Sequence, residues 1–318
     1  MIVDIIYFIG IALTILTGIN LLVHTKKDQK FHTYVLALFF ILLGASNGFY
    51  LLLKYQLILY MPHAFKVMMP LSFSIPVLAY WYVEKTLKRE PGIRNIELLH
   101  FLPVLLVAIN YIPFYTTGTE EKLVILNKAA NELDNLIQID FKGILSDPFI
   151  FLFRTLYSWI YIVLGWRMFY KHGANFKTTG RNNILIYNWI KVFLILQTAY
   201  YFLLPFVYYI MQFYFKNEAQ TIGFTLFLIT SLIFLTLSLY LLIKPKVFIK
   251  IEQFTTVNQT LNLSEEDLKE CLRKSQAYKN PDVKLSDVAI TLDLKEADIN
   301  EVINQSSYTN FRDFINSV

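Results

Sequence analysis

The side chains that most often carry out catalysis are scattered in this sequence rather than grouped. The five histidines are His24, His32, His63, His100 and His172, and the single cysteine is Cys271. The sequence contains no Walker loop, no HExxH motif, no paired-cysteine site and no G-x-S-x-G elbow. We therefore expect no enzyme, no kinase output, no cofactor and no metal site.

Two cations, Arg154 and Lys191, stand inside long apolar stretches, where an unpaired charge costs several kcal/mol. Lys191 is near enough to one end of its stretch for the ammonium group to reach water, and we expect this outcome. Arg154 either snorkels outward or binds an anion or a buried partner. Tyr200 and Tyr201, in the middle of a ring-rich stretch, either pack or line a cavity, and packing is the commoner outcome. Arg154, Tyr200 and Tyr201 are the candidate ligand-binding residues for an unknown small signal.

The composition indicates the class of protein, and therefore the kind of element, in which these residues lie. Of the 318 residues, 55% are apolar and 17% are charged, and the mean hydropathy is +0.45. Average chains carry roughly 25% charged and roughly 45–50% apolar residues. Low charge, sparse glycine and one cysteine exclude a disordered chain, a collagen-like repeat and a disulfide scaffold. The composition is typical of a multi-span membrane protein.

The apolar residues fall into seven stretches, each close to the roughly 20 residues that a membrane span needs. Five carry no Asp, Glu, Lys or Arg: 5–25, 31–53, 98–119, 192–215 and 221–243. Two more are interrupted, 67–83 by two prolines and 148–170 by two arginines. We predict an all-α fold in which residues 1–243 form a seven-helix transmembrane bundle that acts as a sensor domain.

The basic residues predict the orientation of this bundle, because Lys and Arg collect in cytoplasmic loops. The connections after the first, third, fifth and seventh spans carry 14 of them, and the other set carries 6. We therefore expect the N-terminus outside and the C-terminus in the cytoplasm.

The outer loop over residues 116–147 is too long for a simple connection. Apolar residues recur in it at helical spacing: Leu123, Leu126, Ala130, Leu133 and Ile137. We predict a short amphipathic helix that either lies on the membrane surface or caps the mouth of the bundle.

The sequence turns polar after the last span. Residues 244–263 have the character of a linker, and residues 264–318 that of a small soluble helical unit. Apolar residues recur at helical spacing over 268–272, 285–292, 299–303 and 311–318. Two of these helices, joined by a tight turn at 293–295, give a helix-turn-helix layout, whose second helix fits the DNA major groove.

The predicted recognition helix covers residues 296–305, with Ile299, Val302 and Ile303 buried. The candidate DNA-binding residues, which then face the groove, are Lys295, Glu296, Ala297, Asn300, Glu301 and Asn304. Asn300 and Asn304 suit contacts of the adenine-reading type, and the alternative is that they are solvated or cap the helix.

The run YKNPDVKLSDVAITLDLKEADINEVINQSSYTNFRDFINSV resembles the first part of the AraC/XylS-type DNA-binding domain. The matching positions are Leu285, Val288, Ala289, Leu292, Leu294, Ile299, Asn300, Ile303, Asn304, Asn310, Phe311, Asp313, Phe314, Ile315 and Asn316. A seven-span segment followed by this module is similar to a group of membrane-bound AraC-like regulators of bacteria. The resemblance implies a multi-pass protein of the bacterial cell (inner) membrane that binds promoter or operator DNA. The bilayer, a small signal and a second copy in a homodimer are the other expected partners.

The resemblance covers one of the two helix-turn-helix units that the family has. The second unit and most of the connecting helix are absent, so we expect either a fragment or a naturally shortened product. Residues 261–318 carry seven basic and eleven acidic residues, a net charge of −4. Because DNA affinity rests largely on phosphate neutralisation, we expect weak DNA binding by this part alone. We also expect the apolar stripe of Phe311, Phe314, Ile315 and Val318 to lack a packing partner and to be exposed.

Two alternatives remain beside the regulator. A membrane transporter would use the tail for regulation, but no inverted repeat emerges from the spans. A receptor would use the helical tail to bind protein rather than DNA, which its net negative charge favours.

Overall fold

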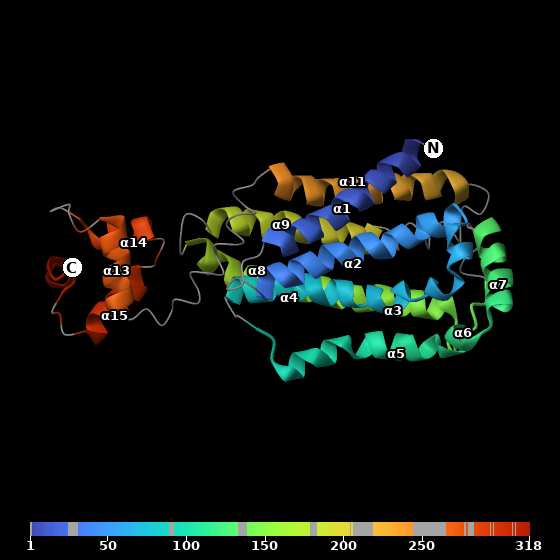
Figure 1. Ribbon diagram of the computed structural model, residues 1–318, viewed down its shortest axis with the longest axis horizontal. Coiled ribbons are helices and arrows are strands. Elements are labelled where there is room, and N and C mark those ends of the chain that lie inside the picture. The colour runs from blue at the N-terminus through green and yellow to red at the C-terminus, as the bar shows by residue number, and fades with distance from the viewer. Residues whose placement is uncertain are drawn as a thin grey trace.

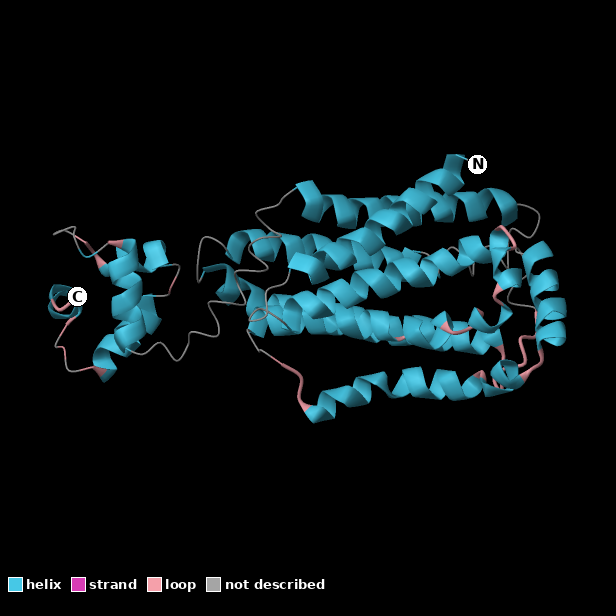
Figure 2. Ribbon diagram, viewed as in Figure 1, coloured by secondary structure: helices cyan, strands magenta, loops and turns pink. Residues whose placement is uncertain are grey.

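The computed structural model describes residues 2–24, 31–88, 92–132, 139–178, 183–203, 205, 219–243, 265–276, 278, 283–292, 294, 296–306, 308 and 310–318. Within these residues every regular element is a helix (Figure 2). The predicted all-α class is therefore confirmed.

Most of the helices run lengthwise, side by side, in one bundle (Figure 1). They are α1 (Ile2–His24), α2 (Phe31–Lys54), α3 (Met68–Ser72), α4 (Ser74–Lys88), η3 (Asn95–Phe101), α5 (Leu102–Asn110), α6 (Ile112–Thr116), α8 (Asp147–Thr178), α9 (Asn183–Thr198), the π-helical η5 (Ala199–Leu203) and α11 (Ala219–Ile243). Five helical segments are long and apolar enough to cross a membrane: Ile2–Val23, Phe31–Lys54, Pro62–Lys88, Asp147–Ala174 and Ile184–Phe202. Two shorter apolar helices, Asn95–Asn110 and Ile229–Leu241, fall within or beside the other two predicted spans. The chain has the character of a helical membrane protein, and the count of seven spans stays a prediction.

Some helix boundaries differ from the predicted ones. The third predicted span is divided at Phe73 into α3 and α4, close to Pro70 and Pro76, which lack a backbone N–H. The helix that contains the start of the charge-free stretch 192–215 begins at Asn183, so Lys191 stands inside it, about two turns from its start. The side chain of Lys191 is exposed on the surface of α9. The end of the sixth predicted span, residues 206–215, lies outside the described residues.

A short helix, α7 (Thr119–Asn131), lies across one end of the bundle, which we call the α7 end (Figure 1). It packs against η1 (Leu57–Tyr60), η2 (Pro62–Ala64) and α2. Leu126 and Ala130 of the predicted stripe are buried there with Ile58 and Phe141. The predicted amphipathic helix is thus present and covers the end of the bundle, while residues 133–138 of its predicted stripe lie outside the described residues.

The C-terminal helices share a hydrophobic core of their own. They are α13 (Glu265–Ser275), α14 (Leu285–Leu292), α15 (Glu296–Gln305) and α16 (Phe311–Asn316). The buried residues are Leu268, Leu272, Val288, Ala289, Ile299, Ile303, Phe314 and Ile315. The predicted linker, residues 244–263, lies outside the described residues.

The expectation of an exposed apolar stripe on the last helix is wrong. Phe314 and Ile315 are buried, and Phe311 and Val318 are half-buried against the same core. Asn310 caps the helix, since its side-chain oxygen accepts a hydrogen bond from the backbone N–H of Asp313 at 2.9 Å. The packing partners come from α13 to α15, so a second helix-turn-helix unit is not needed to cover α16.

Candidate functional site

The predicted ligand-binding residues lie where α8 faces η5. Arg154 is half-buried on α8, and its charge is near enough to act on Tyr200 and Tyr201. The hydroxyl of Tyr200 donates to Asn47 Oδ1 of α2 at 3.2 Å, and the hydroxyl of Tyr7 donates to the carbonyl oxygen of the same asparagine at 3.2 Å. The structure therefore brings together the three residues that the sequence analysis selected.

The regular winding of α9 changes to a π-helix at residues 199–203, which contain both tyrosines. Such segments are rare and occur often at functional sites. Trp159 of α8 fixes this segment: its Nε1 donates to the carbonyl oxygen of Tyr201 at 2.9 Å, and its ring stacks on Phe202 with centroids 4.7 Å apart. One turn earlier, Trp166 Nε1 donates to Thr198 Oγ1 at 2.9 Å. Two tryptophans of α8 thus hold the π segment beside Arg154.

A buried ion pair lies beyond Arg154, toward the α7 end. The ammonium group of Lys66 pairs with the carboxylate of Asp147, the first residue of α8, and lies 3.9 Å from the centroid of the Phe141 ring. The hydroxyl of Tyr111 donates to the same carboxylate at 2.6 Å. The charge of Arg154 also acts on Lys66 and Tyr111. Asp147 lies two helical turns before Arg154 on α8, but its carboxylate is already paired with Lys66.

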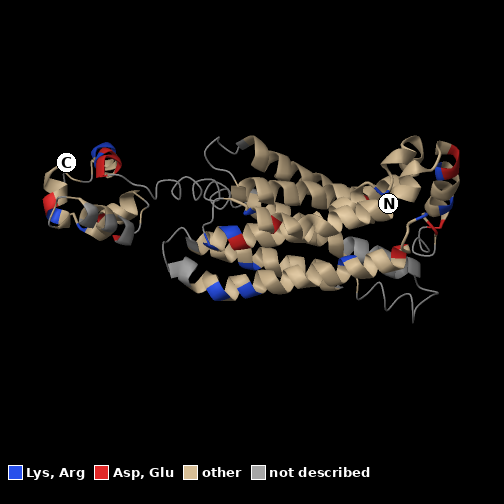
Figure 3. Cartoon of the chain, turned by 90° about the horizontal axis from the view of Figure 1, so that it is seen from below, with Lys and Arg blue, Asp and Glu red and all other residues tan. Residues whose placement is uncertain are grey.

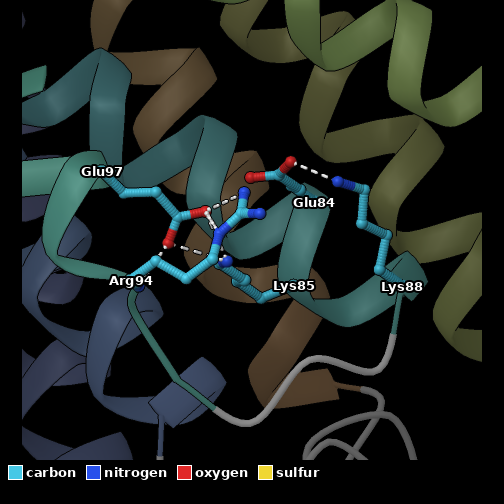
Figure 4. Close-up of polar contacts among 5 residues, drawn as sticks. All are labelled: Glu84, Lys85, Lys88, Arg94 and Glu97. Carbon is cyan, nitrogen blue, oxygen red and sulfur yellow. Dashed lines mark hydrogen bonds and ion pairs between the residues drawn. The ribbon is translucent and has the colours of Figure 1, made fainter.

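A second charged cluster joins the end of α4 to η3 (Figure 4). Lys85 Nζ donates to both carboxylate oxygens of Glu97, at 2.8 and 3.0 Å, and the backbone N–H and guanidinium of Arg94 donate to the same carboxylate. Beside it, Lys88 pairs with Glu84 at 2.7 Å. Burial raises the pKa of Glu97, but the hydrogen bonds from Lys85 and Arg94 outweigh this effect and lower it to about 2. The cluster ties the end of α4 to the start of η3.

A third buried cation lies in α7. Lys122 is 1% exposed, and its Nζ lies 2.9 Å from both His63 Nδ1 and the carbonyl oxygen of Tyr115. It also lies 5.3 Å from the centroid of the Phe114 ring. Burial lowers the pKa of this lysine. These contacts attach α7 to η2 and α6.

The predicted DNA-contacting residues are only partly described. Glu296 and Asn300 are exposed on α15, while Ile299 and Ile303 are buried on its other face, as expected, and Val302 is half-buried. Lys295 and the side chains of Ala297, Glu301 and Asn304 lie outside the described residues. The described side chains on the outer face of α15 are thus free to meet a partner, but α15 contains no Lys or Arg.

The partners of the buried charges are not predictable from the sequence. Lys66 and Asp147 are 81 positions apart, and Lys85 and Glu97 are 12 apart across a helix boundary. No local spacing rule predicts either pair. The one available signal was that each of these charges borders an apolar stretch. No group of three or more His, Cys, Asp or Glu that could hold a metal ion is present in the part of the chain that the structure describes.

In the comparisons with known proteins, no family model, no curated protein and no solved structure matches this chain.

Proposed function

We propose that the chain is a membrane-anchored transcriptional regulator, in which residues 264–318 bind DNA under the control of a signal received by the helical bundle. It resides in the bacterial cell (inner) membrane with its C-terminus in the cytoplasm. One observation carries the proposal. The C-terminal helices share a core of their own in which α15 buries Ile299 and Ile303 and leaves Glu296 and Asn300 exposed, as a recognition helix must. The AraC/XylS resemblance of the same residues supports it.

The test needs both units of the family's DNA-binding domain. The 318-residue chain in lipid nanodiscs is compared with the same chain extended after Val318 by the connecting helix and second unit of an AraC/XylS protein. Each selects DNA from a random pool, and the selected sites are footprinted at two salt concentrations. The 318-residue chain should bind weakly and lose binding at the higher salt, because it is net acidic. The extended chain should protect a longer site than the appended unit does alone.

The additional half-site must depend on α15. Asn300→Ala should change the base preference at one position of that half-site by about 1–3 kcal/mol, without changing helix content. Ile290→Ala is the control, because Ile290 is an exposed residue of α14. If the extended chain selects the same site as the appended unit alone, residues 264–318 do not read DNA and the proposal fails.

A second candidate function is favoured by charge. The net charge of −4 over residues 261–318 and the lack of any basic residue in α15 suit a tail that binds a basic protein surface. Under this alternative the extended chain gains no half-site, and Glu296→Lys weakens the capture of a protein partner in cells.

A further inference from the structure

Arg154 faces the inside of the bundle. The exposed large apolar residues of α8 in this region are Phe149, Leu152, Leu156, Ile160 and Val163, which mark the face of the helix that lipid would cover. Arg154 stands two residues from both Leu152 and Leu156, so at 3.6 residues per turn it points to the opposite side. The buried residues Ile150, Tyr157, Ser158 and Tyr161 share that side. The geometry excludes a snorkel along the lipid-facing surface and leaves Arg154 among the bundle helices.

Among the residues that the structure describes, none accepts a hydrogen bond from the guanidinium group of Arg154. It lies 5.3 Å from the centroid of the Phe151 ring, and it makes no hydrogen bond or ion pair with any residue that the structure describes. Arginine stays protonated in proteins and carries five N–H donors. The donors of this half-buried guanidinium that the described residues leave unused are available to a bound ligand.

Tyr201 provides a second donor that the described residues leave unused. Its side chain is 8% exposed, and its hydroxyl makes no hydrogen bond with the described residues. The nearby charge of Arg154 acts on it. Tyr200, in contrast, already donates to Asn47. Arg154 and Tyr201 are thus two donors in the region where α8 meets η5 that the described residues leave to an anion.

The local charges indicate a monoanion. Lys66 and Arg154 contribute two positive charges and Asp147 one negative charge, so the three groups leave one positive charge in excess. The surroundings are aromatic, with Phe151, Trp159 and Phe202 beside these residues. We propose that Arg154 and Tyr201 bind the carboxylate of a small organic acid with an aromatic or alkyl body. A planar carboxylate matches the fork of an arginine and can accept two parallel hydrogen bonds from it.

The carboxylate site stands on the geometry of α8 and η5 alone, and only its role as the input of the sensor rests on the proposed function. A carboxylic acid can reach the site from two sources, since it is either a water-soluble aromatic acid or a fatty acid dissolved in the bilayer.

The test measures ligand binding to the full chain in phosphatidylcholine nanodiscs. Phenylacetate and decanoate are titrated separately, with phenylacetamide and decanol as uncharged analogues, and binding is followed by tryptophan fluorescence and by the thermal midpoint. At least one acid should bind, and its uncharged analogue should bind about tenfold or more weakly. Saturation by phenylacetate identifies the aqueous source, and saturation by decanoate alone identifies the membrane source.

Three variants locate the binding. Arg154→Gln should weaken binding about tenfold or more, and Tyr201→Phe should weaken it less. Lys191→Gln removes the same charge from an exposed position of α9 and should leave binding unchanged. If neither acid binds better than its uncharged analogue, or if Arg154→Gln binds as well as Lys191→Gln, the proposal is overturned. Because these measurements involve no DNA, the site can hold while the regulator proposal fails, and the reverse.

Discussion

The buried carboxylate of Glu97 accepts hydrogen bonds from two cationic residues. Its side chain is 6% exposed and that of Lys85 is 1% exposed, so both groups have lost most of their hydration. An ion pair of this kind gains little net stability relative to a well-packed apolar pair, but removing one partner is costly. The cluster therefore predicts a strong effect for any change that removes the carboxylate.

Glu97→Gln should destabilise the bundle by about 3 kcal/mol at pH 7, because the pKa of this carboxyl is depressed from 4.5 to about 2. A depressed pKa contributes stability that is fully present above the unfolded value and is lost as the pH falls toward the folded one. The difference between the wild type and Glu97→Gln should therefore shrink between pH 4.5 and pH 2. Thermal midpoints in detergent over this range measure it.

Glu121→Gln is the control, because Glu121 also pairs with a lysine, Lys142, but is 57% exposed. Exposed pairs contribute only about 0–1 kcal/mol. Equal losses in the two variants, or a Glu97→Gln effect that does not depend on pH, would contradict the role of the buried cluster.

At the scale of elements, α1 and α2 approach each other closely through glycines. A Cβ at Gly18 would lie 2.8 Å from the carbonyl oxygen of Ala37, and one at Gly44 would lie 2.6 Å from the side chain of Ile15. Small residues that let backbones approach are a common means of packing helices in membranes. The α1–α2 contact therefore depends on these two positions.

Gly18→Ala should destabilise the bundle by about 1–3 kcal/mol, since a backbone oxygen cannot move aside as a flexible side chain can. Gly48→Ala is the matched control, because the nearest atom to its new Cβ would lie at 3.7 Å, an ordinary contact. Unfolding by denaturant in mixed micelles compares the two variants. A Gly48→Ala loss as large as that of Gly18→Ala would show that helix propensity, rather than the close contact, sets the effect.

The sequence predicted the existence of these elements better than their ends. Apolar composition is a property of a whole stretch of sequence, so it predicts that a helix is present but does not fix the residues at which the helix begins and ends. The charge-free stretch 192–215 does not mark the start of α9, because the exposed Lys191 ends the stretch without interrupting the helix, which begins at Asn183. The packing of α16 was also missed, because a stripe that includes Phe314 shows that a partner is needed but not which helix supplies it.

The candidate ligand site was predictable only in part. A charge within an apolar stretch is visible in the sequence, and this identified Arg154. The π-helical turn at 199–203 and the tryptophan contacts that hold it depend on how α8 and α9 meet. Such tertiary contacts have no local sequence pattern.

At the scale of the whole molecule, most charged residues of the bundle lie toward its two ends (Figure 3). The N-terminus is at the α7 end (Figure 1). The end of α4, with Lys85 and Lys88, and the start of η3, beside Arg94, are at the other end. In the predicted orientation, the α7 end is outside and the other end is cytoplasmic.

The orientation can be tested with reporter fusions along the chain. Fusions after Lys30, Arg94, Arg181 and Lys250 should report the cytoplasm, because these connections carry 14 of the 20 basic residues that flank the predicted spans. A fusion in the 116–147 connection, which includes the acidic first turn of α7, should report the outside. If the fusion after Lys250 reports the outside, residues 264–318 cannot meet DNA, and both the seven-span count and the regulator fail. If instead only the fusion after Arg181 reports the outside, α8 and α9 do not pair as they do in this structure. The Arg154 site on those two helices then fails as well.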